Sequence, residues 1–136
     1  MKKVVILILL LLTSCQTVDH GAIKLNDVIL SFEEQQIILK EHKVSGRDIF
    51  GMKLNGVKPY SYTLDEKPLL IYIYNSNNER EKGLQEFRNK TADINVASFK
   101  YYEVKNVLIF YVYDRDLNVQ IEEKIRKVLF KLENVS

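Results

Sequence analysis

The chain has 136 residues, with 20 lysines and arginines against 18 aspartates and glutamates, and a single cysteine. This length suits one domain with its own core. A lone cysteine excludes a disulfide framework, so apolar packing must supply the stability. A clustered basic face, the mark of nucleic acid binders, is not evident, and we expect no nucleic acid partner.

The first fifteen residues, MKKVVILILLLLTSC, join a charged start to an apolar run and end at Cys15. The run from Val4 to Leu12 is about half of the roughly 20 residues that a membrane-spanning helix needs. Its order of charged, apolar and small residues is typical of an export signal. The alternatives are a single spanning helix, a secreted protein cut elsewhere, and a chance match in an intracellular protein.

The ending Leu12-Thr13-Ser14-Cys15 resembles the lipobox of bacterial lipoproteins. The resemblance implies that residues 1–14 are a cleaved signal peptide and that the Cys15 sulfur carries diacylglycerol, with palmitate as a typical chain. Two or three acyl chains anchor a protein stably, whereas one binds only marginally. We therefore expect a lipid anchor on the outer face of the cell membrane. In a Gram-negative host, Gln16 in place of the inner-membrane aspartate would imply the outer membrane.

Removing the 14 residues of the signal from 136 leaves 122 residues. Two lysines leave with the signal, so the remainder carries 18 basic and 18 acidic residues and is close to neutral. We expect residues 15–25 to be the lipidated N-terminus and a tether. Residues 26–136 are then a single α+β domain.

The first half of this domain carries weak local signals. A helix is expected from Asn26 or Asp27 to about Gln36, with Ser31 as another possible start. Residues 37–44 suit an edge strand, which we favour, or a continuation of the helix. Glycines and a proline then mark loops, and residues 60–64 alternate as a strand does.

The second half is better defined. Residues 69–74 are β-branched and aromatic, as in a strand. Ser76 with Glu79 has capping-box spacing and predicts a helix over 77–90. Residues 96–102 and 106–113 predict a hairpin. Apolar residues then recur at helical spacing and predict an amphipathic C-terminal helix: Ile121, Ile125, Val128, Leu129 and Leu132.

One internal echo appears when the chain is shifted by 39 residues. The segment Leu69–Asn75 falls on Leu108–Asp114, and each copy is a strand followed by a helix. The order strand-helix-strand-strand-helix predicts a two-layer α+β sandwich. We expect a mostly antiparallel sheet with its helices packed on one face and ferredoxin-like connectivity, and leave the strand order open.

Catalytic and cofactor signals are weak in this sequence. Nucleophile elbows and glycine-rich phosphate loops do not occur. The two histidines and the lipidated cysteine do not suit a metal site. We therefore expect no catalytic residues, metal or cofactor. Carboxylate pairs at Glu33-Glu34, Asp65-Glu66 and Glu122-Glu123 suit a solvated surface, although glycosidase-type chemistry stays open for them.

Tyrosines give the main functional lead. If Leu69, Ile71 and Ile73 share one strand face with Leu108, Phe110 and Val112, the tyrosines of both strands share the other. The candidate binding face consists of Tyr72, Tyr74, Tyr111 and Tyr113, with Tyr60 and Tyr62 as further members. Tyrosine suits recognition of a protein, peptide or glycan, and it equally suits a half-wet sheet surface.

The chain also resembles small lipoproteins of low-GC Gram-positive bacteria, through its lipobox and its strands LLIYIYN and NVLIFYVY. This resemblance implies no activity. We expect a non-enzymatic interaction or binding module that meets the membrane through the lipid on Cys15. The alternative is an enzyme or enzyme accessory that acts on cell-envelope material.

Overall fold

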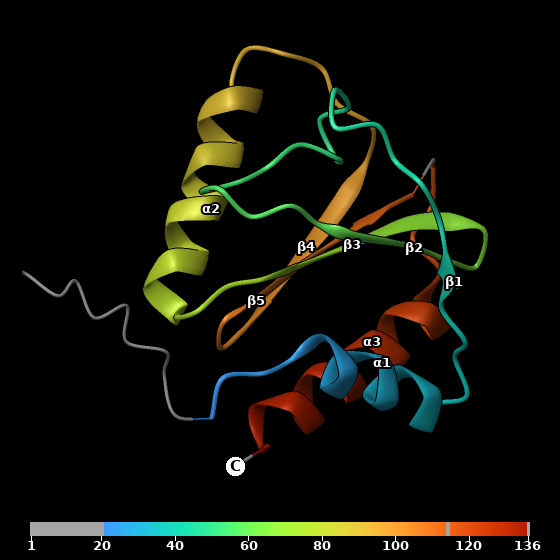
Figure 1. The fold of residues 1–136 in the computed structure, drawn as a ribbon. Coiled ribbons are helices and arrows are strands. Elements are labelled where there is room, and N and C mark those ends of the chain that lie inside the picture. The colour runs from blue at the N-terminus through green and yellow to red at the C-terminus, as the bar shows by residue number, and fades with distance from the viewer. Residues whose placement is uncertain (1–20, 114, 136) are drawn as a thin grey trace, which may run out of the picture.

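The computed structural model describes residues 21–113 and 115–135. The expected signal peptide, Cys15 and most of the expected tether lie outside these residues. The described part of the chain forms, in order, α1 (Leu25–Glu34), β1 (Lys40–Glu41), β2 (Tyr60–Leu64), β3 (Lys67–Ile73), α2 (Asn77–Thr91), β4 (Phe99–Val104), β5 (Val107–Val112) and α3 (Val119–Glu133) (Figure 1). Within those bounds, none of the helices combines the length and apolar character needed to cross a membrane.

The strands form one sheet in the order β1-β2-β3-β5-β4, and every neighbouring pair is antiparallel. Strands β2 and β3 are joined by Asp65 and Glu66, both with positive φ, at 51° and 62°. Positive φ at both central residues gives the twist that a two-residue hairpin needs. The β4–β5 pair confirms the hairpin expected for this part of the sequence.

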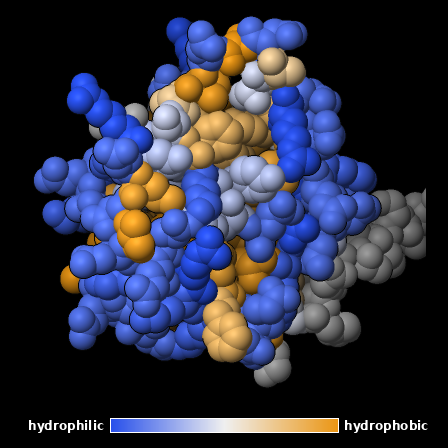
Figure 2. All heavy atoms as spheres, turned by 180° about the vertical axis from the view of Figure 1, so that it is seen from behind, coloured by the Kyte–Doolittle hydropathy of each residue, from blue (hydrophilic) through white to orange (hydrophobic). Residues whose placement is uncertain are grey.

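Helices pack on both faces of the sheet (Figure 1). Helices α1 and α3 cover one face, where the buried residues include Val28, Phe32, Leu69, Ile71, Ile109, Ile125 and Val128. Helix α2 and the segment 44–57 cover the other, where they include Leu54, Leu70, Tyr72, Leu84, Phe87 and Phe110. Seen from behind, the surface shows small apolar patches among hydrophilic side chains, because both faces of the sheet are covered (Figure 2).

The α+β class and an antiparallel sheet with helices packed against it are confirmed. The sheet with α1 and α3 makes the expected two-layer sandwich. The expectation that the helices share one face is wrong, because α2 lies on the opposite side. The physical reason is that β3 is apolar on both faces, with Leu69 on one and Leu70 on the other, so each face requires cover.

The connectivity is ferredoxin-like in part. Strands β3 and β4 are linked through α2, and β5 lies between them, which is the split β-α-β arrangement. The strand on the other side of β3 is β2, which precedes it in the chain and joins it by a hairpin. Helix α3 then returns to the face opposite α2.

Local signals set the helix ends. The Ser76 hydroxyl accepts a hydrogen bond from the Glu79 N–H at 3.1 Å, so the predicted cap of α2 is confirmed. Helix α3 begins after Asn118, whose side chain accepts from two backbone N–H groups. Its buried residues are Ile125, Val128 and Leu132, as expected.

The N-terminal part differs in detail from the expectation. Helix α1 begins at Leu25, and Ser31 lies inside it with its hydroxyl donating to the Asp27 carbonyl at 2.7 Å. A start at Ser31 is therefore wrong. Ile23 is only 1% exposed, so the packed domain begins before the expected boundary at residue 26. The edge strand within 37–44 is confirmed but is only two residues long.

Candidate functional site

The four tyrosines of the expected binding face do not share a face. The register pairs Leu69 with Tyr111 and Tyr72 with Leu108. Tyr111 therefore lies on the α1–α3 side with Leu69, and Tyr72 lies on the α2 side. Paired residues of β3 and β5 are both odd-numbered or both even-numbered, and paired side chains lie on the same face of the sheet. The internal echo shifts by 39, an odd number, so each tyrosine and its equivalent in the other strand point to opposite faces.

These tyrosines are also covered. Tyr72, Tyr74 and Tyr111 are at most 3% exposed, and Tyr113 is partly buried against the α1–α3 core. An open phenolic surface on this sheet is therefore wrong. Tyr60 is 47% exposed, but it pairs with Ile71 and therefore lies on the opposite face of the sheet from Tyr72.

Tyr72 and Tyr74 instead hold the cover of the sheet in place. Their hydroxyls donate to the carbonyls of Met52 at 2.8 Å and Leu54 at 3.1 Å. Burial raises the pKa of both phenols, so they stay neutral donors. On the other face Tyr111 donates to the Leu64 carbonyl at 3.4 Å, and burial raises its pKa as well.

Asn55 ties the same cover to α2. Its backbone N–H donates to the Glu86 carboxylate at 2.5 Å, and its side-chain amide donates to the Glu79 carboxylate at 2.6 Å. Hydrogen bonds from Lys90 and from the Asn55 backbone hold the pKa of Glu86 below its usual value. Hydrogen bonds from Tyr72 and Tyr74 on one side and from α2 on the other thus fix residues 52–55 over the sheet.

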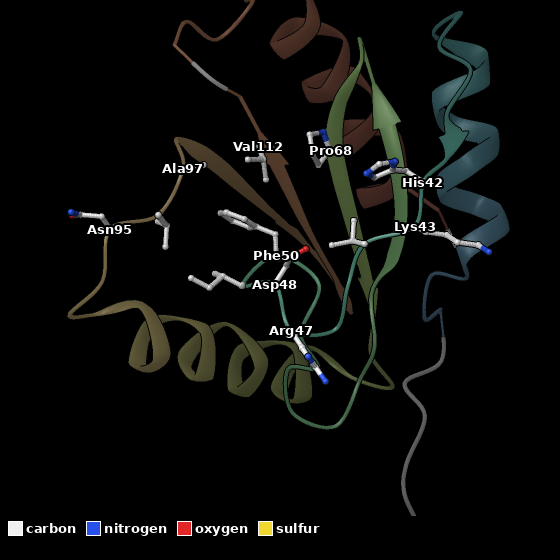
Figure 3. A pocket seen from close by; sticks show the side chains of 12 residues that line it. His42, Lys43, Arg47, Asp48, Phe50, Pro68, Asn95, Ala97 and Val112 are labelled. Carbon is white, nitrogen blue, oxygen red and sulfur yellow. The ribbon is translucent and has the colours of Figure 1, made fainter.

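Residues 42–50, which precede these fixed residues, form one wall of a hollow of about 520 Å³, which we call the Phe50 hollow (Figure 3). Its other walls come from the start of β3, the end of β5 and the loop before β4. Its apolar lining consists of Val44, Ile49, Phe50, Pro68, Val96, Ala97 and Val112, and its polar lining of His42, Lys43, Arg47, Asp48 and Asn95. Its volume falls within the range of pockets that hold small molecules.

A second hollow, of about 870 Å³, lies against the β1–β2 edge, and we call it the Tyr60 hollow. It shares His42, Lys43 and Val44 with the first, so the segment 42–44 forms a wall of both. Its remaining lining is more polar: Glu41, Lys58, Pro59, Tyr60, Ser61 and Tyr62. We use the name loop cleft for the two hollows together.

The segment 40–58 that borders the loop cleft is positively charged. It holds five basic residues, Lys40, Lys43, Arg47, Lys53 and Lys58, against two acidic ones, Glu41 and Asp48. All five basic side chains are exposed, and none forms an ion pair with another described residue. From the sequence we predicted an edge strand as far as residue 44 and loops beyond it, and no site; the basic excess of this segment was the available signal.

Ile23, near the first described residue, is held at the opposite end of the sheet. Asn106 is 1% exposed, and its side chain accepts from the Ile23 N–H at 2.7 Å. Its amide donates to the carbonyls of Ile23 and Tyr74, each at 2.8 Å. We call these contacts the Asn106 junction. They fix the first packed residue beside the β4–β5 turn and the end of β3.

The residues of the three carboxylate pairs are not among those that line the loop cleft. Glu34 forms an ion pair with Lys131, and Glu122 forms ion pairs with Lys100 and Arg126. Asp65 and Glu66 form the β2–β3 turn. Within residues 21–113 and 115–135, the side chains of histidine, cysteine, aspartate and glutamate do not gather into a group of three that could hold a metal.

Comparisons with protein families, curated proteins and solved structures gave no match to this chain.

Proposed function

We propose that this chain is a lipid-anchored binding module on the outer face of the cell membrane. In this proposal Cys15 carries the lipid, and the domain presents the loop cleft to ligands of the envelope without catalysing a reaction. One observation carries it: the Asn106 junction and the loop cleft lie at opposite ends of the same strands.

Strand β3 gives the scale of this separation. Pro68 lines the Phe50 hollow and Tyr74 belongs to the Asn106 junction, six residues along the chain. At about 3.3 Å per residue, an extended strand covers about 20 Å over that length. In Figure 1 the first described residues and the loop above β2 and β3 accordingly lie at opposite ends of the sheet.

The anchor would hold the junction end close to the bilayer. Eight residue steps separate Cys15 from Ile23, and a fully extended chain covers at most about 29 Å over that length. Because Asn106 fixes Ile23 to the sheet, the tether pulls on the β4–β5 turn. The loop cleft then faces away from the membrane, toward material in the surrounding envelope.

Metabolic labelling tests the anchor. A fatty-acid analogue should label the wild-type chain, and Cys15→Ser should lose both the label and processing at that site. A control variant, Ser136→Cys in the Cys15→Ser background, should remain unlabelled because its cysteine is outside the lipobox. Equal labelling of wild type and Cys15→Ser would refute the anchor.

Cysteine labelling on intact cells tests the orientation. Asn95 lines the loop cleft and Asn77 begins α2 near the junction end, and both are exposed. Asn95→Cys and Asn77→Cys should react equally well with a small maleimide. A bulky polyethylene-glycol maleimide should react several-fold faster with Asn95→Cys. Equal rates with the bulky reagent would contradict the proposed orientation.

A further inference from the structure

The Phe50 hollow combines an apolar interior with a polar rim. Figure 3 shows Phe50 and Val112 turned toward the interior, with Pro68 and Ala97 bordering it. The hollow is a place where apolar surface of a ligand can be removed from water, and such burial is favourable in proportion to its area.

The rim supplies the charge. Lys43 and Arg47 border the hollow and point outward from it, away from Phe50 (Figure 3). Both are exposed and neither is held in an ion pair by another residue of the described ranges, so both can turn toward a bound acid. Asp48 also borders the hollow and opposes an anion, which leaves one net positive charge on this rim.

The surrounding segment adds to this field. Lys40, Lys53 and Lys58 are close in sequence, are exposed, and raise the excess of basic over acidic residues in the segment 40–58 to three. Such exposed charges act through water and are screened by salt. They raise the local concentration of anions more than they bind any one of them.

We propose that the Phe50 hollow binds a small anionic amphiphile, with an apolar body inside the hollow and an acid group between Lys43 and Arg47. This inference rests on the proposed function, since it names the ligand class of the same cleft. The apolar body can be a ring system or an acyl chain, and both share the chemistry that the site offers. The arginine fork suits a carboxylate, sulfonate or phosphate.

Calorimetry on the full chain, as it is isolated from cells, tests this proposal. The chain is placed in phosphatidylcholine nanodiscs, and the heats from empty nanodiscs are subtracted. The probes are naphthalene-2-sulfonate, 2-naphthol as its uncharged counterpart at neutral pH, and octane-1-sulfonate. We expect saturable binding of the sulfonates at one site per chain, and the tighter of the two identifies a ring or an acyl body.

Two variants separate charge from apolar contact. Lys43→Gln with Arg47→Gln should weaken sulfonate binding about threefold to tenfold, the size expected for two exposed charge pairs, and leave 2-naphthol within about twofold. Ala97→Trp should fill the hollow and weaken both probes at least tenfold. The control Lys82→Gln changes an exposed residue of α2 and should alter the affinity for neither probe.

Each contrary result overturns the proposal. Absence of saturable binding, equal affinity for sulfonate and 2-naphthol, or an unchanged affinity in the Lys43/Arg47 variant would refute an anionic amphiphile in this hollow. Failure of the lipid label or of the orientation test would instead refute the anchored module and leave these affinities unaffected. The two failures are therefore distinguishable.

Discussion

Asn106 is the side chain on which the N-terminal attachment of the domain depends. Its three hydrogen bonds, at 2.7 to 2.8 Å, satisfy both polar groups of the Ile23 backbone and the carbonyl of Tyr74. Asn106→Ala would leave these groups without partners. An unsatisfied buried polar group costs about 1–3 kcal/mol.

The loss of stability in Asn106→Ala has an upper limit, because the N-terminal segment can detach from the sheet and leave its polar groups to water. Detachment exposes Ile23, whose burial is worth about 1.5–3 kcal/mol, and lets water satisfy its backbone groups. The Tyr74 carbonyl then remains the principal group that lacks a partner. The two costs add, so we expect Asn106→Ala to lower the free energy of unfolding by about 2.5–6 kcal/mol.

Urea unfolding measures this change, and hydrogen exchange at the Ile23 amide shows whether the segment detaches. Asn75→Ala is the matched control, because Asn75 is exposed beside the same strand end and should change stability by less than about 0.5 kcal/mol. Asn106→Asp should recover stability as the pH falls, because a carboxylate facing two carbonyls has a raised pKa and regains a donor once protonated. An Asn106→Ala protein as stable as the Asn75→Ala control would refute the reasoning.

Three further predictions concern the core and the cover. Ile125→Ala should lower stability by about 2–5 kcal/mol and Glu123→Ala by less than about 0.5 kcal/mol in urea unfolding, and similar losses would show that the faces of α3 are misassigned. Gly83→Ala places a Cβ 2.6 Å from Tyr74 Cζ and should lower the free energy of unfolding by about 1–3 kcal/mol through overpacking. The same substitution should cost less in the Tyr74→Phe background, and losses of stability that simply add would contradict the contact. The pKa of Glu86 is lowered in the folded protein, so its carboxylate stabilises the fold above the ordinary carboxyl pKa, and this stability is lost as the pH falls through the lowered pKa. Glu86→Gln should therefore be less stable than wild type at pH 7 and should lose less stability on acidification to pH 3. Parallel pH profiles of the two proteins would contradict this.

Residues close together in the chain determined the element types and most of their ends. Ser76 and Glu79 cap α2 within one turn, and the apolar spacing around Ile125 sets the buried face of α3. These signals act over about four residues, so they can be followed in the sequence. The α+β class depends on the same local patterns.

Strand register needed the tertiary structure. Alternation within each strand separates Tyr72 from Ile71 and Tyr111 from Phe110, but it does not say which sides of two strands coincide. A shift of one residue in pairing reverses every side chain, and the pairing of Leu69 with Tyr111 is decided by packing on both faces of the sheet. The expectation of a shared tyrosine face was wrong for this reason.

The loop cleft likewise exists only in three dimensions. Its walls come from residues near Phe50, Pro68, Ala97 and Val112, which are far apart in the chain and are brought together by strand order and by the packing of the segment 44–57 on the sheet. Asn106 reaches Ile23 across 83 positions in the same way. The amino-acid sequence by itself determined the local elements and the lipobox pattern at Cys15, because those depend on neighbouring residues. Tertiary packing decided the register, the buried tyrosines and the cleft, because each depends on contacts between distant segments.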